Sequence, residues 1–458
     1  GGYVDYDFID GKPLAKPQKH PRSFWEKVVP LDEFKIRLRG EDVIVKPWEY
    51  KVGTARAIFF EAVCPMWARN LTERIYIEQD EEEKFLKYVL LAKASAYFIE
   101  KVIGIKEIDY VDLQEAYTAL LPLILPLDRK YRLVIHTPGP WGHPTFPREY
   151  IEREFGWSLT TPYVVLTEIG LTLVRKAFVV SRKQLDVIGQ TFPHYVNKIT
   201  CVTNGVDVVR WMDPELRKMF EKGVLDDKSF VERHKTLKRR LLRYIRTVKD
   251  LDVDENIFVV VWARRLVRYK RPEFIIKIIE EKDVEALYIL AGKAHPKDRE
   301  GLDYMVKFKQ LSDNFKNVVY LPRYDVQVAK IILQGSDLLT FTPFSGWEAC
   351  GTSYMKAGLN GVPTLSSRDG GILEVVKDGF NGWLFGKDIR EFINIYTDPR
   401  VNQINSEEYR EFREKLVKIS EMYYDSYEHY VEVSLNAIKT FYEYYDISRA
   451  LREYYDKP

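Results

Sequence analysis

Short runs of β-branched and apolar residues alternate with amphipathic stretches from about Arg132 onward. Several of these runs end directly in Gly, Pro or polar residues, as buried strands do. Seven runs are expected to be strands: residues 132–136, 177–181, 199–204, 257–263, 286–292, 317–321 and 337–342. Strands that alternate with helix-length segments form parallel sheets, so the pattern predicts an α/β protein. In doubly wound sheets ligands bind beyond the carboxyl ends of the strands, and we expect the chemistry there.

The chain has 458 residues, which is more than one hydrophobic core usually covers, so two domains are expected. We place a first domain at residues 1–197, a second at 198–430, and a Tyr-rich helical tail at 431–458 that packs back on the first domain. Residues 230–250 form a basic amphipathic helix, and Leu237, Leu241, Leu242 and Ile245 mark its apolar stripe. Its basic face is interpreted as solvated, because no aromatic platform for nucleic acid accompanies it. Asp80 begins an acidic first helical turn.

Composition narrows the function classes. The 70 basic and 68 acidic residues leave a net charge of +2, which gives no general reason to expect nucleic acid or a membrane as partner. Three scattered cysteines, Cys64, Cys201 and Cys350, predict neither a disulfide framework nor a metal site and suit a reducing cytoplasm. The longest apolar run, residues 119–127, is short and holds two prolines, so the chain is expected to be soluble. Heavy charge and 30 Tyr are typical of thermophile proteins.

The most informative stretch is EACGTSYMKAGLNG, residues 348–361. A helix that opens on a Gly-Thr-Ser turn offers free N–H groups to a phosphate, and Lys356, about one and a half turns in, can reach an aldehyde on the same molecule. Pyridoxal phosphate carries both groups. Local spacing alone is also explained by a simple helix cap with a solvated lysine and a left-handed end at Gly361.

A second stretch, IFVVVWARRLVRYKRPEF, predicts a buried strand that leads into a strongly basic loop. Five cations at a strand's carboxyl end favour an anion site, although pairing with neighbouring acids is the alternative. The cations are Arg264, Arg265, Arg268, Lys270 and Arg271, and Pro272 fits the first turn of the next helix.

The sequences of these stretches closely resemble segments of the α-glucan phosphorylase family, in particular of its short bacterial and archaeal type. Glu348 stands eight residues before Lys356, and SSRDGG at 366–371 is similar to the family's next segment. AGKAHPKD at 291–298 is nearly identical to the corresponding segment of the family. His295 itself is interpreted as a structural or surface histidine. Residues 201–211, 317–330 and 135–147 also resemble family segments. The resemblance runs from about Tyr3 to the C-terminus.

This resemblance implies two Rossmann-like doubly wound domains that face a cleft, the GT-B type of fold, and pyridoxal 5′-phosphate as cofactor. It implies that Lys356 holds the cofactor aldehyde, and that Lys270 and Arg265 bind phosphate as catalytic residues. His136 joins them at the sugar, through its backbone carbonyl. Further cofactor contacts would be Gly351, Thr352, Tyr324, Trp211 and Arg264. Substrate contacts would be Glu348, Asn204, Tyr269, Cys350 and Asp369.

The implied reaction is phosphorolysis of a terminal α-1,4-linked glucose to glucose 1-phosphate with retention of configuration. The cofactor's 5′-phosphate would share protons with the substrate phosphate, which protonates the glycosidic oxygen. The implied partners are an α-1,4-glucan or maltodextrin, inorganic phosphate and glucose 1-phosphate, with self-association into a homo-oligomer left open. Two rivals remain: a nucleotide-sugar-dependent glucan synthase of the same fold, and a catalytically impaired glucan-binding protein.

The chain departs from the family pattern at several positions. Cys350 replaces a serine, Asp207 stands where short members often carry histidine, and residues 113–117 follow an Asn-Glu-Gly-His segment only loosely. The family also carries a Gly-Gly-Leu-Gly turn upstream of a Gly-Tyr segment like Gly2-Tyr3, and this sequence has no residues there. We therefore expect a processed or truncated chain, with reduced activity unless that turn is supplied separately.

Overall fold

The computed structural model describes residues 3–455, so Gly2 of the Gly-Tyr segment lies outside the described residues. The chain forms two compact units, and each is described by itself. The first unit contains Lys16–Val179 and Phe192–Thr200. The second contains Tyr6–Ala15, Val180–Thr191 and the chain from Cys201 onward. The hairpin of β1 (Val4–Ile9) and β2 (Lys12–Pro17) has residues in both units.

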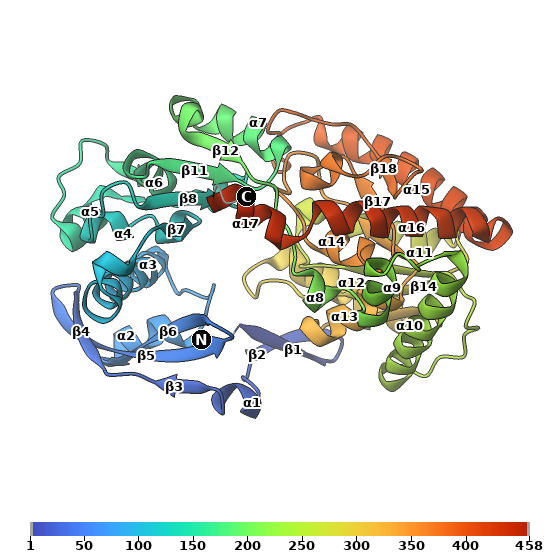
Figure 1. Ribbon diagram of the computed structural model, residues 1–458, viewed down its shortest axis with the longest axis horizontal. Helices are drawn as coiled ribbons and strands as arrows, with labels where there is room; N and C mark the ends of the chain where they lie inside the picture. The colour runs from blue at the N-terminus through green and yellow to red at the C-terminus, as the bar shows by residue number, and fades with distance from the viewer. Residues whose placement is uncertain (1–2, 456–458) are drawn as a thin grey trace. The chain divides into compact units, whose positions relative to one another are not determined.

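The second unit is built on a six-stranded parallel sheet (Figure 1). Its strands in chain order are β13 (Val259–Ala263), β14 (Leu287–Ala291), β15 (Val318–Leu321), β16 (Leu338–Phe341), β17 (Thr364–Ser367) and β18 (Trp383–Phe385). Four of these were predicted from the apolar runs, and the structure confirms an α/β protein with parallel sheets. The Ser-rich β17 and the three-residue β18 gave no apolar run long enough to predict them.

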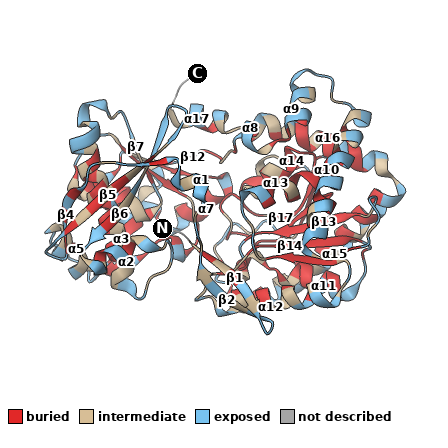
Figure 2. Ribbon diagram, turned by 90° about the horizontal axis from the view of Figure 1, so that it is seen from below, coloured by how far each residue is buried: buried red, intermediate tan, exposed pale blue. Residues whose placement is uncertain are grey.

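The order of strands across this sheet is β15-β14-β13-β16-β17-β18. The chain starts at the centre with β13, proceeds outward to β15, and then returns to the other side of β13 with β16. The loops after β13 and β16 therefore lead away from each other, and the carboxyl ends of these two strands form a switch point. Strands β13, β14 and β17 are buried (Figure 2), as expected for a parallel sheet covered on both faces.

The second unit also contains eleven helices among its described residues, and several of them connect the strands of this sheet. The helices are α7 (Arg182–Thr191), α8 (Val208–Trp211), α9 (Pro214–Glu221), α10 (Asp227–Val248), α11 (Glu273–Glu281), α12 (Arg299–Asn314), α13 (Val326–Gly335), α14 (Ser353–Gly358), α15 (Val401–Asp425), α16 (Tyr427–Tyr444) and α17 (Ile447–Tyr455). Pro272 lies at the N-cap of α11, one residue before the predicted first turn. Helix α16, in the Tyr-rich tail, packs against α10, α14 and α15 of its own unit. The packing of the tail on the first domain stays a prediction.

Helix α10 corresponds to the predicted basic helix, and its four predicted stripe residues are buried. One part of the expectation was wrong, because the basic face is not wholly solvated. Lys238 is buried and its Nζ lies 2.6 Å from Oδ2 of Asp337, while Nε2 of His234 lies 2.9 Å from Oδ1. Charge patterning could not reveal this ion pair, because its acidic partner lies 99 residues away in sequence.

The described part of the first unit contains two four-stranded sheets and one two-stranded sheet. Its parallel sheet has the order β12-β11-β8-β7, from β7 (Val111–Gln114), β8 (Tyr131–Ile135), β11 (Lys176–Val179) and β12 (Ile199–Cys201). The last three were predicted, although β12 is shorter than expected. A separate antiparallel sheet comprises β3 (Val28–Pro30), β4 (Phe34–Leu38), β5 (Glu41–Val52) and β6 (Ala55–Cys64), and the sequence analysis missed it.

Helices and the two-stranded antiparallel sheet of β9 (Thr145–Pro147) and β10 (Tyr163–Val165) complete the first unit. The helices are α1 (Arg22–Trp25), α2 (Met66–Glu73), α3 (Glu81–Tyr97), α4 (Leu121–Ile124), α5 (Arg148–Phe155) and α6 (Leu166–Leu173). Asp80 caps α3 by accepting a hydrogen bond from the Glu83 N–H, and three glutamates follow it. This confirms the predicted acidic first turn. Within residues 3–455, we find no helix with the length and apolar character needed to span a membrane.

Candidate functional site

Three charged side chains meet at the switch point of the second sheet. Arg264 follows β13 directly, and its Nη2 donates a 2.6 Å hydrogen bond to Oε2 of Glu348 in the loop after β16. The Nζ of Lys270 lies 3.5 Å from the same oxygen. Because β13 and β16 are neighbours in the sheet, two loops 84 residues apart in sequence converge here. The structure therefore brings together three residues that the sequence analysis had singled out separately.

Two nitrogens of the Arg264 guanidinium make no hydrogen bond within the described residues. Its Nε and Nη1 are buried and have no hydrogen-bond partner in the part of the chain that the structure describes. The group also lies over the ring of Phe341, 3.7 Å from the ring centroid. A buried donor without a partner costs about 1–3 kcal/mol, so such groups usually have a ligand or water to bind. The two nitrogens fit the oxygens of a phosphate, which arginine binds in a fork.

Burial and charge act against each other in this cluster. Burial raises the pKa of Glu348, but the charges of Lys270, Arg264 and Arg265 outweigh it and hold the pKa below its ordinary value. Burial lowers the pKa of Lys270 to about 7, although Glu348 works in the opposite direction. The site therefore holds one carboxylate among several cations, with one cation close to losing its proton near neutrality. An added anion would favour the protonated form of Lys270.

Two of the five predicted loop cations pair with acids other than Glu348. Arg271 is buried, and its Nη1 donates to Oε2 of Glu408 at 2.6 Å. Arg268 lies 3.8 Å from Glu300 near the surface. Arg264 and Lys270 also pair with an acid, Glu348, but Arg264 keeps two buried nitrogens without a partner among the described residues. Arg264, Arg265 and Lys270 therefore remain the anion-binding candidates.

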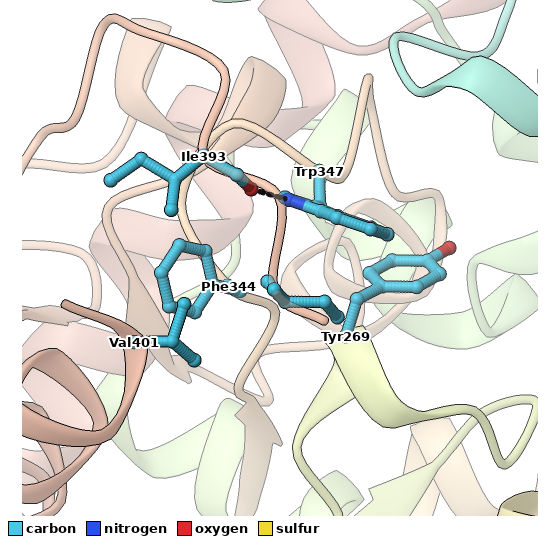
Figure 3. Close-up of a cluster of buried hydrophobic side chains, with 6 residues drawn as sticks. Tyr269, Phe344, Trp347, Ile393 and Val401 are labelled. Atoms are coloured by element: carbon cyan, nitrogen blue, oxygen red, sulfur yellow. Dashed lines mark hydrogen bonds between the residues drawn. The ribbon is translucent and has the colours of Figure 1, made fainter. Parts of the chain in front are cut away.

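Tyr269 belongs to an apolar cluster beneath this loop (Figure 3). The cluster consists of Tyr269, Phe344, Trp347, Ile393, Ile395 and Val401. The Tyr269 ring lies beside Trp347, with 5.6 Å between centroids, and its hydroxyl points away from Phe344 and Val401. Trp347 in turn donates from Nε1 to the Ile393 carbonyl at 2.7 Å. These contacts fix the backbone on both sides of the charged cluster.

Arg265 and Tyr324 lie at neighbouring loop positions. Arg265 is exposed, and its charge opposes the rise that burial causes in the pKa of Tyr269. Tyr324 follows β15 and is half-buried. Burial raises the pKa of Tyr324, and the charge of Arg264 opposes this rise, so the phenol lies within electrostatic reach of the guanidinium. Both placements agree with a shared anion site, while the individual roles stay predictions.

Asp369 holds the loop that carries Glu348. Its carboxylate accepts hydrogen bonds from the backbone N–H groups of Gly346, Trp347 and Glu348, at 2.8, 3.2 and 2.7 Å. The side chain is fully buried, and the Nζ of Lys183 lies 3.8 Å away. These are the contacts of a residue that positions Glu348. The predicted contact between Asp369 and substrate stays a prediction.

Lys356 lies on α14, and this helix is shorter than expected. Its six residues, Ser353–Gly358, place Lys356 one turn from the start. The predicted one and a half turns was therefore wrong, because the helix begins after Thr352 and Gly361 adopts a left-handed conformation soon after its end (φ 71°). A helix this short has little dipole, so a phosphate here would depend on individual N–H groups.

The ammonium of Lys356 lies against an aromatic face. Its Nζ is 4.0 Å from the centroid of the Trp211 ring, and within residues 3–455 it has no ion pair or hydrogen bond. Burial lowers the pKa of Lys356 to about 8, with a smaller effect from Arg210. The amide Nδ2 of Asn360 donates to the carbonyls of Trp211 and Lys356 at 3.0 and 2.8 Å, which ties the two segments together. A half-buried amine without a counter-ion is the form of lysine that adds to an aldehyde.

Gly351 and Thr352 precede this helix. A Cβ on Gly351 would lie 2.3 Å from Cζ of Phe341, so the position has no room for a side chain. Thr352 is the N-cap residue, but its hydroxyl makes no capping hydrogen bond. The simple capping alternative is therefore not seen for this side chain.

Cys350 and Asn204 lie nearby in the second unit. The Sγ of Cys350 is buried 3.4 Å from the hydroxyl of Tyr354, and burial raises the pKa of this thiol to about 12. The thiol is therefore protonated and packed at neutral pH. The amide side chain of Asn204 is half-buried and has no hydrogen-bond partner in the described chain, so it remains available to a ligand.

His136 lies in the first unit and is described there by itself. Its Nε2 lies 2.7 Å from Oε1 of Gln114, and its backbone N–H donates to Oε1 of Glu115 at 2.8 Å. The hydroxyl of Thr137 donates to the same oxygen at 2.8 Å, while Oε2 of Glu115 is buried without a partner among residues 3–455. Glu115 also has a left-handed backbone (φ 68°), which is rare for a residue with a side chain. The carboxyl group of Glu115 thus positions the His136 loop.

The sequence analysis missed three supporting residues. Phe341 under Arg264, Lys183 beside Asp369 and Glu115 beside His136 gave no local motif signal. Only the loose match of residues 113–117 to a family segment pointed toward Glu115. The described residues hold no cluster of His, Cys, Asp or Glu that could bind a metal ion.

Comparisons with known proteins identify the family of this chain. The family model for carbohydrate phosphorylase matches residues 214–457. A maltodextrin phosphorylase from Thermococcus litoralis is 26% identical over 384 residues, which covers 70% of this chain and 45% of the relative. A glycogen phosphorylase from Aquifex aeolicus is 26% identical over 438 residues, which covers 77% and 63%. The chain therefore spans less than two thirds of the length of these two relatives.

Proposed function

This chain belongs to the carbohydrate phosphorylase family, and from that premise we propose that it is a retaining α-glucan phosphorylase. It would transfer the terminal α-1,4-linked glucose of a maltodextrin or glycogen chain to inorganic phosphate. The proposed fold is the GT-B type, with two Rossmann-like domains that face a cleft. The strand order of the six-stranded sheet supports it, because the same order occurs in doubly wound nucleotide-binding folds.

One observation carries the proposal. Arg264 forms a charged cluster with Glu348 and Lys270, and two of its buried nitrogens have no hydrogen-bond partner among residues 3–455. Such donors are costly unless an anion binds them. Two phosphate groups in contact repel each other strongly in a buried site unless several cations surround them. A cluster of Arg264, Arg265 and Lys270 supplies that neutralisation.

The residues present fit pyridoxal 5′-phosphate. Lys356, with a lowered pKa and no counter-ion, would hold the aldehyde, and Trp211 would pack beside it. The N–H groups near Gly351 and Thr352, the phenol of Tyr324 and the guanidinium of Arg264 would hold the phosphate. When bound, the cofactor supplies a phosphate group that exchanges protons with the substrate phosphate.

The chain's own residues would then bind and orient the substrates. Arg265 and Lys270 hold inorganic phosphate, which gives its proton to the glycosidic oxygen as the C1–O bond breaks. The same phosphate forms the new bond to C1, so the products are glucose 1-phosphate and a glucan with a free 4-hydroxyl. Glu348, Asn204 and Tyr269 would bind sugar hydroxyls, and Asp369 holds the loop of Glu348 in place. Cys350, which is buried, would shape this subsite.

In the first unit, Glu115 fixes the His136 backbone for a sugar contact. All three cysteines are free, which agrees with the proposed cytoplasmic location. The free amide of Asn204 and the ordered His136 loop both support a sugar as the second substrate.

The proposal is tested by a spectrum and a product assay. We expect near-ultraviolet absorption from pyridoxal phosphate, fixation by borohydride, and a modified peptide that contains Lys356. We also expect glucose 1-phosphate from maltodextrin and phosphate. Absence of the cofactor, together with turnover of a nucleotide sugar, would favour the synthase. Glucan binding without phosphate-dependent product would favour the impaired binding protein.

A further inference from the structure

The loop that carries Asn204 is bound by the C-terminal part of the same unit. The N–H of Val206 donates to the Tyr445 carbonyl at 2.8 Å, and the N–H of Ile447 donates to the Val206 carbonyl at 3.0 Å. These two hydrogen bonds form an isolated parallel β-bridge between Val206 and Asp446. The backbone at the start of α17 therefore holds the backbone that follows Asn204.

Gly205 permits this close approach of two backbones. A Cβ at position 205 would lie 2.9 Å from Cα of Ile447 and 2.9 Å from the carbonyl oxygen of Tyr445. Both are backbone atoms, which cannot rotate away as the end of a flexible side chain can. Glycine is the residue that fits where two backbones approach so closely. The glycine after Asn204 is thus explained by its contact with residues 445–447.

Arg449 on α17 binds carbonyl groups of the loop. Its Nη2 donates to the Thr203 carbonyl at 2.6 Å and to the Asn204 carbonyl at 3.3 Å, while its Nε donates to the Tyr444 carbonyl at 2.7 Å. The N–H of Asn204 donates to the Val180 carbonyl at 3.2 Å. The backbone of Asn204 is therefore fixed on both sides. Its side-chain amide has no partner among residues 3–455.

Glu374 holds the side chain that precedes Asn204. Its Oε2 accepts hydrogen bonds from the Thr203 hydroxyl at 2.6 Å and from the Tyr444 hydroxyl at 2.8 Å. Its Oε1 accepts from the N–H of Arg182 at 2.9 Å, and the carboxyl side chain is only 6% exposed. A buried carboxylate with three donors is a fixed point, because it loses several hydrogen bonds if any of these segments moves.

The same short segment also holds Glu348. Asp369 and Glu374 lie at the two ends of a short 3-10 helix, Gly370–Glu374. Asp369 accepts from the backbone N–H of Glu348, and Glu374 accepts from the hydroxyl of Thr203. The two predicted sugar contacts, Glu348 and Asn204, are therefore placed relative to each other by one segment.

We propose that Arg449 and Glu374 are positioning residues for the sugar. They do not touch the substrate; they set the place of the Asn204 amide beside Glu348. A side chain can distinguish one sugar hydroxyl from another only if its own backbone is held in the productive geometry. The role toward sugar rests on the proposed function, whereas the anchoring of the loop rests on the hydrogen bonds within the second unit.

The test compares the affinities of the full chain for glucose 1-phosphate and for inorganic phosphate, by calorimetric titration. In Arg449→Ala we expect glucose 1-phosphate to bind about tenfold more weakly. Inorganic phosphate should bind unchanged, because the anion-binding candidates belong to another loop. Arg452→Ala is the matched control, since Arg452 lies on the same helix, is exposed and has no side-chain partner within residues 3–455. This variant should bind both ligands like the unaltered chain.

A double-variant cycle separates positioning of the amide from mere anchoring of the C-terminal segment. In an Asn204→Ala chain the amide is gone, so adding Arg449→Ala should weaken glucose 1-phosphate no further. Additive losses, unchanged glucose 1-phosphate affinity in Arg449→Ala, or a parallel loss of phosphate affinity would overturn the proposal. If the alanine variant does not fold, Arg449→Lys replaces it in the cycle. Lysine can still donate to the Thr203 carbonyl but lacks the fork, so a loss of about threefold is expected.

Hydrogen exchange distinguishes failure of this inference from failure of the proposed function. Arg449→Ala should accelerate exchange in a peptide that covers residues 203–206, and Arg452→Ala should not. Unchanged exchange and affinity in Arg449→Ala, in a chain that forms glucose 1-phosphate, would overturn only the positioning role. If the unaltered chain neither binds nor forms glucose 1-phosphate, the proposed function fails and the role toward sugar fails with it, even where exchange is accelerated.

Discussion

The Phe341 ring contacts both Arg264 and Gly351: the guanidinium carbon of Arg264 is 3.7 Å from its centroid, and a Cβ on Gly351 would approach its Cζ to 2.3 Å. A side chain at position 351 must therefore displace the ring. The ring in turn supports the group that holds two free donors. One aromatic side chain thus couples the backbone just before the helix of Lys356 to the proposed anion site.

Gly351→Ala tests this coupling. We expect a loss of about 1–3 kcal/mol of stability from overpacking and a several-fold weaker binding of inorganic phosphate. Calorimetric titration of phosphate and thermal unfolding would measure the two effects. The double variant Gly351→Ala, Phe341→Leu provides space for the new methyl group and should recover stability. Normal phosphate affinity in Gly351→Ala would contradict the coupling.

Glu348→Gln should strengthen the binding of inorganic phosphate. The substitution removes the negative charge beside Arg264 and Lys270, so inorganic phosphate should bind more tightly, by about tenfold at pH 6. The gain should shrink toward pH 8, because Glu348 helps to keep the pKa of Lys270 up to about 7 and that support is lost. Phosphate-dependent thermal stabilisation measures the effect.

The matched control for this experiment is Glu300→Gln. Glu300 also pairs with an arginine of the same loop, Arg268, but both side chains are about 40% exposed. This variant should bind phosphate normally. Weaker phosphate binding in Glu348→Gln at pH 6 would show that the carboxylate organises the cations rather than competing with the anion.

The raised pKa of Glu115 should make the free energy of unfolding depend on pH. Burial raises the pKa of its carboxyl to about 7, against hydrogen bonds from Thr137 and the His136 N–H. The folded chain then holds a proton that the unfolded chain releases at a lower pH. The contribution of Glu115 is therefore most favourable below about pH 4.5 and is lost as the pH rises through 7.

Glu115→Gln removes this titration. The difference in unfolding free energy between variant and parent should shift in favour of the variant from pH 5 to pH 7.5, by about 1 kcal/mol per pH unit at most. Urea unfolding at a series of pH values measures the difference, and other titrating groups cancel in it. A difference that is independent of pH would mean that Glu115 is ionised throughout.

Asp369→Asn should destabilise the loop of Glu348. The amide can no longer accept from all three backbone N–H groups, and buried Lys183 loses a nearby negative charge. We expect a loss of about 3 kcal/mol in urea unfolding. Asp398→Asn is the control, because Asp398 pairs with exposed Arg400 and should cost below about 1 kcal/mol. Equal losses of unfolding free energy in the two variants would show that Asp369 does not position the loop of Glu348.

Most of the second unit could be predicted from its sequence. Its parallel strands are fully buried, so each central strand is a continuous apolar run that stands out from its surroundings. The antiparallel sheet of the first unit was missed because β6 alternates weakly and many of its side chains are exposed. Long-range partners such as Asp337 for Lys238 leave no local trace in the chain.

The candidate site was predictable where resemblance and strand ends coincide. Arg264 and Glu348 follow strands that the sheet order makes neighbours, and the predicted loops meet as expected. The sequence could not predict the short length of α14, because the same residues are also compatible with a longer capped helix. Nor could it predict that Asp369 would face backbone N–H groups, since this depends on how the loop after β16 turns at Gly346.

The packing of α14 against the last long helix sets an order of events during synthesis. A Cβ on Gly358 would lie 1.9 Å from Cδ2 of Phe441, so the segment that carries Lys356 is completed by α16. All six strands of the sheet leave the ribosome before that helix does. A nascent chain or premature-stop product that ends before Tyr427 would therefore have its sheet but lack a finished lysine site. The proposed cofactor would then bind only after α16 has packed against α14.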